Sequence, residues 1–139
     1  MHRLTAFVLL LAIFVAQSFV FSPYAFAATG VPSIISYQGR LRDASGNLLG
    51  ASTGTPYYFR LSIYDNATVG SGSKLWPSGA PSLTTSTVTS GIFTVKIGDT
   101  TNGYPDTLDY NFQDNKDVYL QIEVSSDGST FETLAPRQR

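Results

Sequence analysis

Hydrophobic and polar residues alternate with a period of two along much of the chain. The clearest run is 57–64, in which every second residue from Tyr57 onward is apolar. The same alternation returns in 92–97 and in 118–124. Because successive side chains of a strand point to opposite faces of a sheet, each run predicts a half-buried β-strand.

Weaker runs predict four more strands, at 34–41, 74–76, 83–89 and 130–134. Turn sequences separate the runs, and the clearest is Asp127-Gly128, a dipeptide typical of tight hairpins. No stretch keeps a helical period. The pattern therefore predicts an all-β domain: an antiparallel β-sandwich of about seven short strands, of the Ig-like or transthyretin-like kind.

The inward positions of these strands give a predicted core, which is sufficient for one modest domain. Its members are Ile35, Tyr37, Leu41, Phe59, Leu61, Ile63, Trp76, Phe93, Val95, Ile97, Leu120, Ile122, Val124 and Phe131.

Residues 1–27 have a different composition from the rest. A basic head at Arg3 precedes an apolar run from Leu4 to Val20, and the segment ends in the small-residue sequence Ala25-Phe26-Ala27. These are the three parts of a secretory signal peptide, which predicts a signal helix, cleavage after Ala27 and an exported, extracellular or cell-surface protein. An uncleaved membrane anchor is the alternative, since the apolar run approaches the length of a full span.

The remaining chain, 28–139, is predicted to be a single domain, and its composition excludes several classes of function. It contains no Cys, no His and no Met, and it carries eight basic and ten acidic residues. Disulfides, thiolate chemistry, Cys- or His-ligated zinc and imidazole catalysis are therefore excluded. A net charge of −2 gives no electrostatic reason to expect nucleic acid as a partner.

One segment is rich in the oxygen ligands that calcium binds. Its acidic and amide residues fit no EF-hand loop, because position six lacks Gly and position twelve lacks Glu. The alternatives are an irregular calcium site and a surface loop whose polar residues cap turns. The calcium candidates are Asp106, Asp109, Asn111, Asp114 and Asp117.

Two further functions depend on other side chains. Surface aromatics could form a sugar-binding platform, and the candidates are Tyr58, Tyr64, Tyr104, Tyr110, Tyr119 and Trp76. A hydrolase that uses only carboxylates is formally open, but Glu123 and Glu132 are expected to be solvated surface charges. No catalytic or cofactor-binding residue is predicted.

The stretch from Tyr37 to Asn47, with the sequence YQGRLRDASGN, resembles the opening of an N-terminal β-sandwich domain of large exported bacterial surface proteins. These proteins are described as tail-fibre-like or adhesin-like. Further segments match in order at 59–65, 74–76, 91–98, 118–124 and 134–139. The Gly39–Leu49 motif is also similar to transthyretin-like modules.

The resemblance implies a non-catalytic structural or interaction module, without cofactors. Its expected partners are other protein chains or the continuation of a longer surface protein, with glycans as an alternative and the membrane only through an uncleaved signal segment. In the family, the segment matching 136–139 runs on into a further strand and a stalk. The resemblance thus leaves two expectations: a stand-alone domain, or one truncated at its C-terminal end.

Overall fold

The computed structural model describes residues 33–139, so the predicted signal segment lies outside the described residues. Within that range, no helix is long and apolar enough to cross a membrane. Residues 33–139 form seven strands and one short 3-10 helix, and for this part of the chain the prediction of an all-β, antiparallel fold is confirmed. The elements in order are β1 (Ile35–Arg40), β2 (Thr55–Tyr64), β3 (Lys74–Trp76), β4 (Thr84–Val88), β5 (Ile92–Ile97), η1 (Thr100–Asn102), β6 (Tyr119–Ser125) and β7 (Glu132–Thr133).

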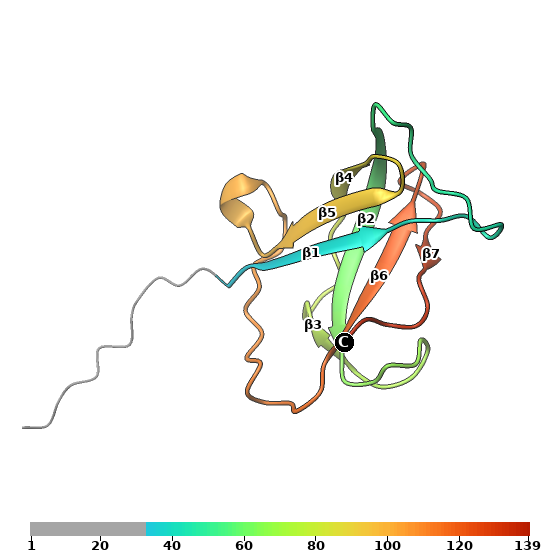
Figure 1. The fold of residues 1–139 in the computed structure, drawn as a ribbon. Helices are drawn as coiled ribbons and strands as arrows, with labels where there is room; N and C mark the ends of the chain where they lie inside the picture. The colour runs from blue at the N-terminus through green and yellow to red at the C-terminus, as the bar shows by residue number, and fades with distance from the viewer. Residues whose placement is uncertain (1–32) are drawn as a thin grey trace, which may run out of the picture. The chain divides into compact units, whose positions relative to one another are not determined.

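Five strands form one sheet around β2, the longest strand (Figure 1). One edge of β2 pairs with β6 from Tyr58 to Tyr64, and β7 continues the sheet beyond β6. The other edge pairs with β4 along 55–59 and with β3 at 63–64. Both edges of β2 are therefore occupied, and this strand is the centre of the sheet.

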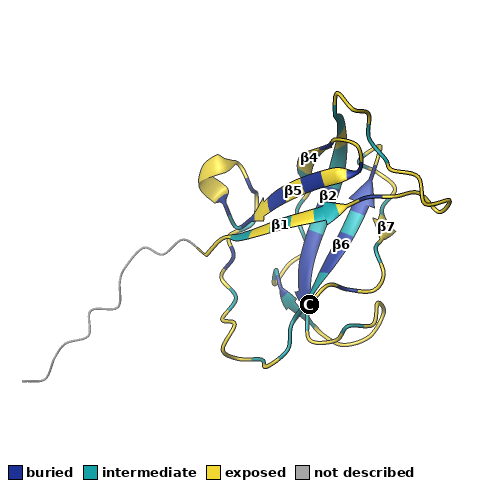
Figure 2. Cartoon of the chain, viewed as in Figure 1, coloured by how far each residue is buried: buried dark blue, intermediate teal, exposed yellow. Residues whose placement is uncertain are grey.

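The other two strands, β1 and β5, form a separate antiparallel ribbon that crosses the first sheet (Figure 1). The two sheets meet at a stacked aromatic pair, Phe59 of β2 and Phe93 of β5, whose ring centroids lie 4.6 Å apart. Figure 2 shows that the buried residues lie mainly on the strands, while most of the loop residues are exposed. A two-stranded ribbon is marginal alone, so this contact with the larger sheet is what stabilises it.

The predicted inward face is largely correct, because alternation places these residues on one side of each strand. Ten of the fourteen predicted core residues are buried in the hydrophobic core: Leu41, Phe59, Leu61, Ile63, Trp76, Phe93, Val95, Ile97, Ile122 and Val124. Ile35, Tyr37 and Leu120 pack against it half-buried.

One inward prediction is wrong and three core residues were not predicted. Phe131 is not a core residue, because its ring lies 3.9 Å below the guanidinium of Arg60 on the outer side of β2. Val88, Tyr104 and Leu108 are buried instead. Tyr104 and Leu108 lie in the segment after η1, where no alternation marks an inward face.

Candidate functional site

The ribbon β1–β5 has a free edge along β1. In an antiparallel pair, residues alternate between positions bonded across the ladder and positions whose backbone groups point away from it. The backbone N–H of Leu41 donates to the carbonyl of Gly91 at 2.7 Å, which fixes the alternation. By this register Tyr37 and Gly39 bond to β5, while the backbone groups of Ser36, Gln38 and Arg40 point outward.

A groove of about 460 Å³ runs beside this free edge. β1 forms one wall and the chain segment 134–138 forms the other. Phe93, Ile122 and Leu134 are among its apolar lining residues, so core side chains reach the groove. We call this feature the β1 groove.

The apolar lining depends on a glycine in β1. Gly39 lies directly opposite Phe93 in the ladder, and a Cβ at position 39 would lie 2.6 Å from Cζ of Phe93. No side chain fits there without moving the ring. Because Gly39 has none, the phenyl ring of Phe93 covers the strand and extends to the β1 groove.

Charge in the β1 groove has one sign. Among the described residues that line it, Arg40 and Arg42 are basic and none is acidic. Both arginines are exposed, and Arg42 also donates through Nη1 to the carbonyl of Gly46 at 2.8 Å. The groove therefore combines unpaired backbone, an apolar lining and a positive rim.

A second hollow of about 650 Å³ lies where the β4–β5 hairpin opens. The two strands pair only beside the turn, where the backbones of Thr89 and Ile92 exchange hydrogen bonds. Further along, the hydroxyl of Ser86 donates to the carbonyl of Thr94 at 2.9 Å in place of a ladder bond. We call this hollow the hairpin cleft; threonines and Lys96 line it.

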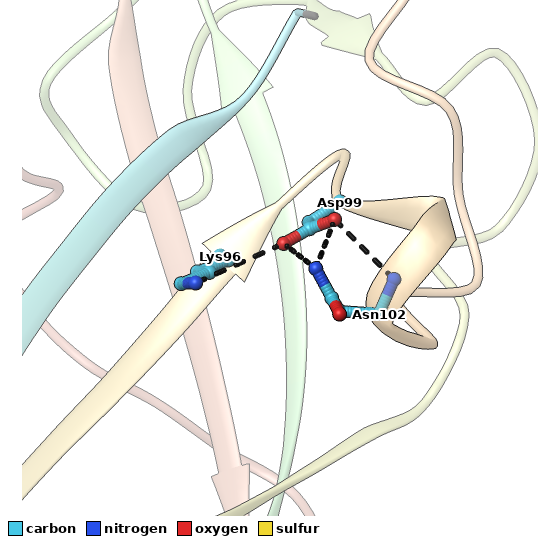
Figure 3. Close-up of polar contacts among 3 residues, drawn as sticks. All are labelled: Lys96, Asp99 and Asn102. Atoms are coloured by element: carbon cyan, nitrogen blue, oxygen red, sulfur yellow. Dashed lines mark hydrogen bonds and ion pairs between the residues drawn. The ribbon is translucent and has the colours of Figure 1, made fainter.

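A buried acid, Asp99, is among the residues that line the hairpin cleft. Figure 3 shows its polar contacts with Lys96 and Asn102. The carboxylate of Asp99 accepts two bonds from the side-chain amide of Asn102, at 2.8 and 3.0 Å, and one from its backbone N–H at 3.3 Å. Lys96 Nζ lies 4.0 Å from the same carboxylate. Asp99 thus caps the short helix η1, a structural role that satisfies backbone donors at a helix start.

Two aromatics of the predicted sugar platform are core residues, so the platform as predicted is wrong at these positions. Trp76 is 1% exposed and Tyr104 is 6% exposed, and their rings stack. The indole N–H of Trp76 donates to the carbonyl of Thr107 at 2.9 Å, which satisfies its one polar atom inside the core. Burial, with a smaller contribution from nearby Asp106, raises the pKa of the Tyr104 hydroxyl.

The other four aromatics of that prediction are partly exposed but engaged in different places. The ring of Tyr64 lies under the guanidinium of Arg137, and the ring of Tyr110 meets Phe112 edge to face. Tyr58 lies beside Gly128, and Tyr119 opposite Tyr64 in the β2–β6 ladder. Tyr64 and Tyr119 are therefore neighbours in the sheet, while Tyr110 and Tyr58 have other contacts.

The predicted calcium residues have separate partners. Asp106 accepts from the hydroxyl and backbone N–H of Ser82, and Asp114 accepts from Asn111. Asp117 pairs with Arg139, and Asp109 is exposed. Within 33–139, no three His, Cys, Asp or Glu side chains lie together as a group that could hold a metal ion.

The turns hold the most strongly perturbed acid. Backbone N–H groups of Thr130 and Ser129, with the hydroxyl of Ser125, donate to Asp127 and lower its pKa to about 2. A similar set of bonds, led by the side-chain amide of Asn47, lowers the pKa of Asp43. Hydrogen bonds to the charged form explain both shifts. Both acids organise turns of the β6–β7 hairpin and of the loop after β1.

Arg137 was not predicted and is the most heavily bonded side chain near the chain end. It is 5% exposed. Its Nη1 donates to three backbone carbonyls of the loop 66–71, at 2.7 to 2.9 Å, and its Nε donates to Gln121 at 2.9 Å. All these acceptors are neutral. Arg137 therefore fastens the end of the domain to the β2–β3 loop.

Together these observations define, for residues 33–139, an all-β domain in which the edge of β1 lies open beside a partly apolar groove. The chain matches, over residues 36–137, the model of a family described as Domain of unknown function (DUF8740), and it belongs to that family. The match runs from the second residue of β1 through Arg137. No curated protein and no solved structure matches the chain.

Proposed function

We propose that this protein is a non-catalytic interaction module of a secreted or cell-surface bacterial protein, of the tail-fibre-like or adhesin-like kind. Its two sheets would form an Ig-like or transthyretin-like β-sandwich that serves as a rigid support. The observation that carries the proposal is the outward-facing backbone of Ser36, Gln38 and Arg40 above the β1 groove. Unpaired edges of this kind are templates for joining another chain.

The polar side chains of the domain agree with a supporting role. Asp43, Asp99 and Asp127 organise turns, and Arg137 fastens the chain end. The sequence of residues 1–27 supports export. The carbohydrate-binding alternative is weakened by the burial of Trp76 and Tyr104, and we do not adopt it.

Export and interaction can be tested together in cells. The full sequence is expressed in a bacterial host with a photo-cross-linking amino acid at Gln38, beside the groove, or at exposed Gln113 as the control. We expect an N-terminus at Ala28, exposure to protease added outside the cell, and a discrete cross-linked species only for position 38. Retention in the cytoplasm, or identical cross-linking at both positions, would contradict the proposal.

A further inference from the structure

We infer that the β1 groove binds one extended strand of another polypeptide, which has small or apolar side chains on its inner face and acidic ones on its outer face. The inference rests on the proposed function and specifies the partner. Its first support is the backbone. Ser36, Gln38 and Arg40 direct their N–H and C=O groups away from β5, and among the described residues no turn or loop bond uses these groups.

The opposite edge of the ribbon is less open. On β5, the carbonyl of Thr94 accepts from the Ser86 hydroxyl, and the carbonyl of Lys96 accepts from the backbone N–H of Asp99 at 3.2 Å. The edge of β1 therefore offers more unpaired acceptors than the edge of β5. An added strand gains most of its binding from such main-chain bonds.

The inner face of the added strand would meet the groove lining. Phe93, Ile122 and Leu134 lie there, and the missing side chain of Gly39 lets the Phe93 ring reach that position. The volume of about 460 Å³ and the length of β1, six residues, suit a short strand with small inward side chains. Alternate residues of that strand would point inward, as in any strand.

The outer face is selected by charge. Arg40 and Arg42 line the groove, and no acidic residue in the described chain lines it with them. A second copy of this chain joined through its own β1 would bring two such basic edges together, which is unfavourable. A strand with Asp or Glu on its outer face complements Arg40, so the charge favours a different polypeptide over a second copy.

The test uses two peptides. One is a nine-residue peptide that alternates valine with aspartate, and its twin alternates valine with lysine. The protein is expressed from the full sequence and purified in the form that the cell produces, whether or not residues 1–27 have been removed. We expect saturable binding of the aspartate peptide, measured by fluorescence anisotropy. Amide hydrogen exchange should slow at Gln38 and Arg40 when the peptide is added.

Matched variants locate the site. Gln38 and Thr94 face each other in the β1–β5 ladder, and both direct their N–H away from it on opposite edges. Gln38→Pro should weaken peptide binding at least about tenfold, because it removes an edge donor. Thr94→Pro, on the other edge, should leave binding unchanged. Thermal unfolding checks that both variants are folded.

Arg40→Glu tests the charge without changing the backbone. In this variant the lysine peptide should bind more tightly than the aspartate peptide, and the ratio of the two affinities should change about tenfold. An exposed charge pair changes affinity by a few-fold, and here an attractive pair is replaced by a repulsive one. Equal affinities of both peptides in the original protein and in this variant would overturn the acidic-strand inference. So would peptide binding that survives Gln38→Pro in a folded protein.

Two other outcomes are separable. A concentration-dependent dimer in sedimentation that Gln38→Pro abolishes would identify a second copy as the occupant and overturn the choice of partner. If neither peptide binds while cross-linking at Gln38 still occurs in cells, the strand inference fails and the proposed interaction function stands. If export and cross-linking fail while the aspartate peptide binds, the proposed function fails and the strand inference stands.

Discussion

The long strand of one sheet, β2, and the edge strand of the other, β1, differ in how completely they are paired. β2 has partners along both edges: β6 on one, and β3 with β4 on the other. Among the described strands β1 has one partner, β5, and it presents its outer edge to the β1 groove. Buried side chains are plentiful in both, so burial does not account for the difference.

This contrast shows that the stability of a strand and the availability of its backbone for pairing are separate properties. The sheet around β2 is held by ladders on both edges of that strand and by Arg137, and so it acts as the support. The ribbon depends on packing against that support through Phe59 and Phe93, which leaves its outer edge free. A strand can be firmly held by its inner face and still offer its backbone to another chain.

The largest expected effect comes from removing the contact that joins the two sheets, the Phe59–Phe93 stack. Phe59 is 0% exposed, and Phe59→Ala should lower the free energy of unfolding by about 3–5 kcal/mol in a urea titration. Both sheets lose packing, so one cooperative transition is expected. Phe112→Ala, the same change at a 42% exposed ring, is the control and should cost about 1 kcal/mol. Similar losses for both variants would contradict the assigned core.

Removing the fastening of the larger sheet should have the next largest effect. Arg137→Ala leaves three loop carbonyls and Gln121 without their donor, at a cost of about 3 kcal/mol. Arg137→Lys should recover little, because an ammonium lacks the planar fork of the guanidinium. Arg139→Ala, at an exposed ion pair, should cost under about 1 kcal/mol. Urea titrations of the three variants should rank their losses of unfolding free energy in this order. An Arg137→Ala protein as stable as the original protein would refute the prediction.

A smaller change acts on the ribbon alone. Gly39→Ala places a Cβ against the Phe93 ring and should cost about 1–3 kcal/mol through overpacking. Gly79→Ala is the matched control, because nothing lies within 4 Å of a Cβ there. Thermal unfolding should separate the two variants. Equal melting temperatures would mean that the ring moves aside freely.

The smallest effect concerns acid. The pKa of Asp127 is lowered to about 2 in the folded protein from an ordinary value near 3.8. The charged carboxylate therefore stabilises the fold fully at pH values above that ordinary pKa. This contribution is lost as the pH falls from about 4 towards 2. Asp127→Asn should therefore lose less stability than the original protein between pH 5 and pH 2.5. Asp109→Asn, in an exposed loop, should follow the original protein, and a steeper loss in Asp127→Asn would disprove the assignment.

The sequence alone predicts the strands correctly where they follow a local alternation of apolar and polar residues. The strands at 74–76 and 92–97 have the predicted bounds, and the fold class follows from the same period. Tyr104 and Leu108 were missed because their burial comes from a loop that packs beside Trp76, and no local period records that packing. Trp76 was offered both as core and as surface, and its buried indole decides for the core.

The candidate site was less predictable than the fold. Alternation shows that β1 is a strand, but which of its edges is free depends on how distant strands pair. Arg137 and Arg139 look alike in the sequence, and only the positions of loop 66–71 and Gln121 distinguish them. The groove and the fastening are both products of long-range contacts.

The Arg137 fastening also decides how the domain would carry mechanical load. Tension applied at residue 139 first reaches the backbone bonds between Gln138 and Leu120 of β6 and then the guanidinium, before it reaches the two-residue strand β7. From there it passes to the loop 66–71 and so to β2, rather than peeling β7 from the sheet edge. Since every acceptor around the guanidinium is neutral, its grip should change little with the protonation state of the domain's acids.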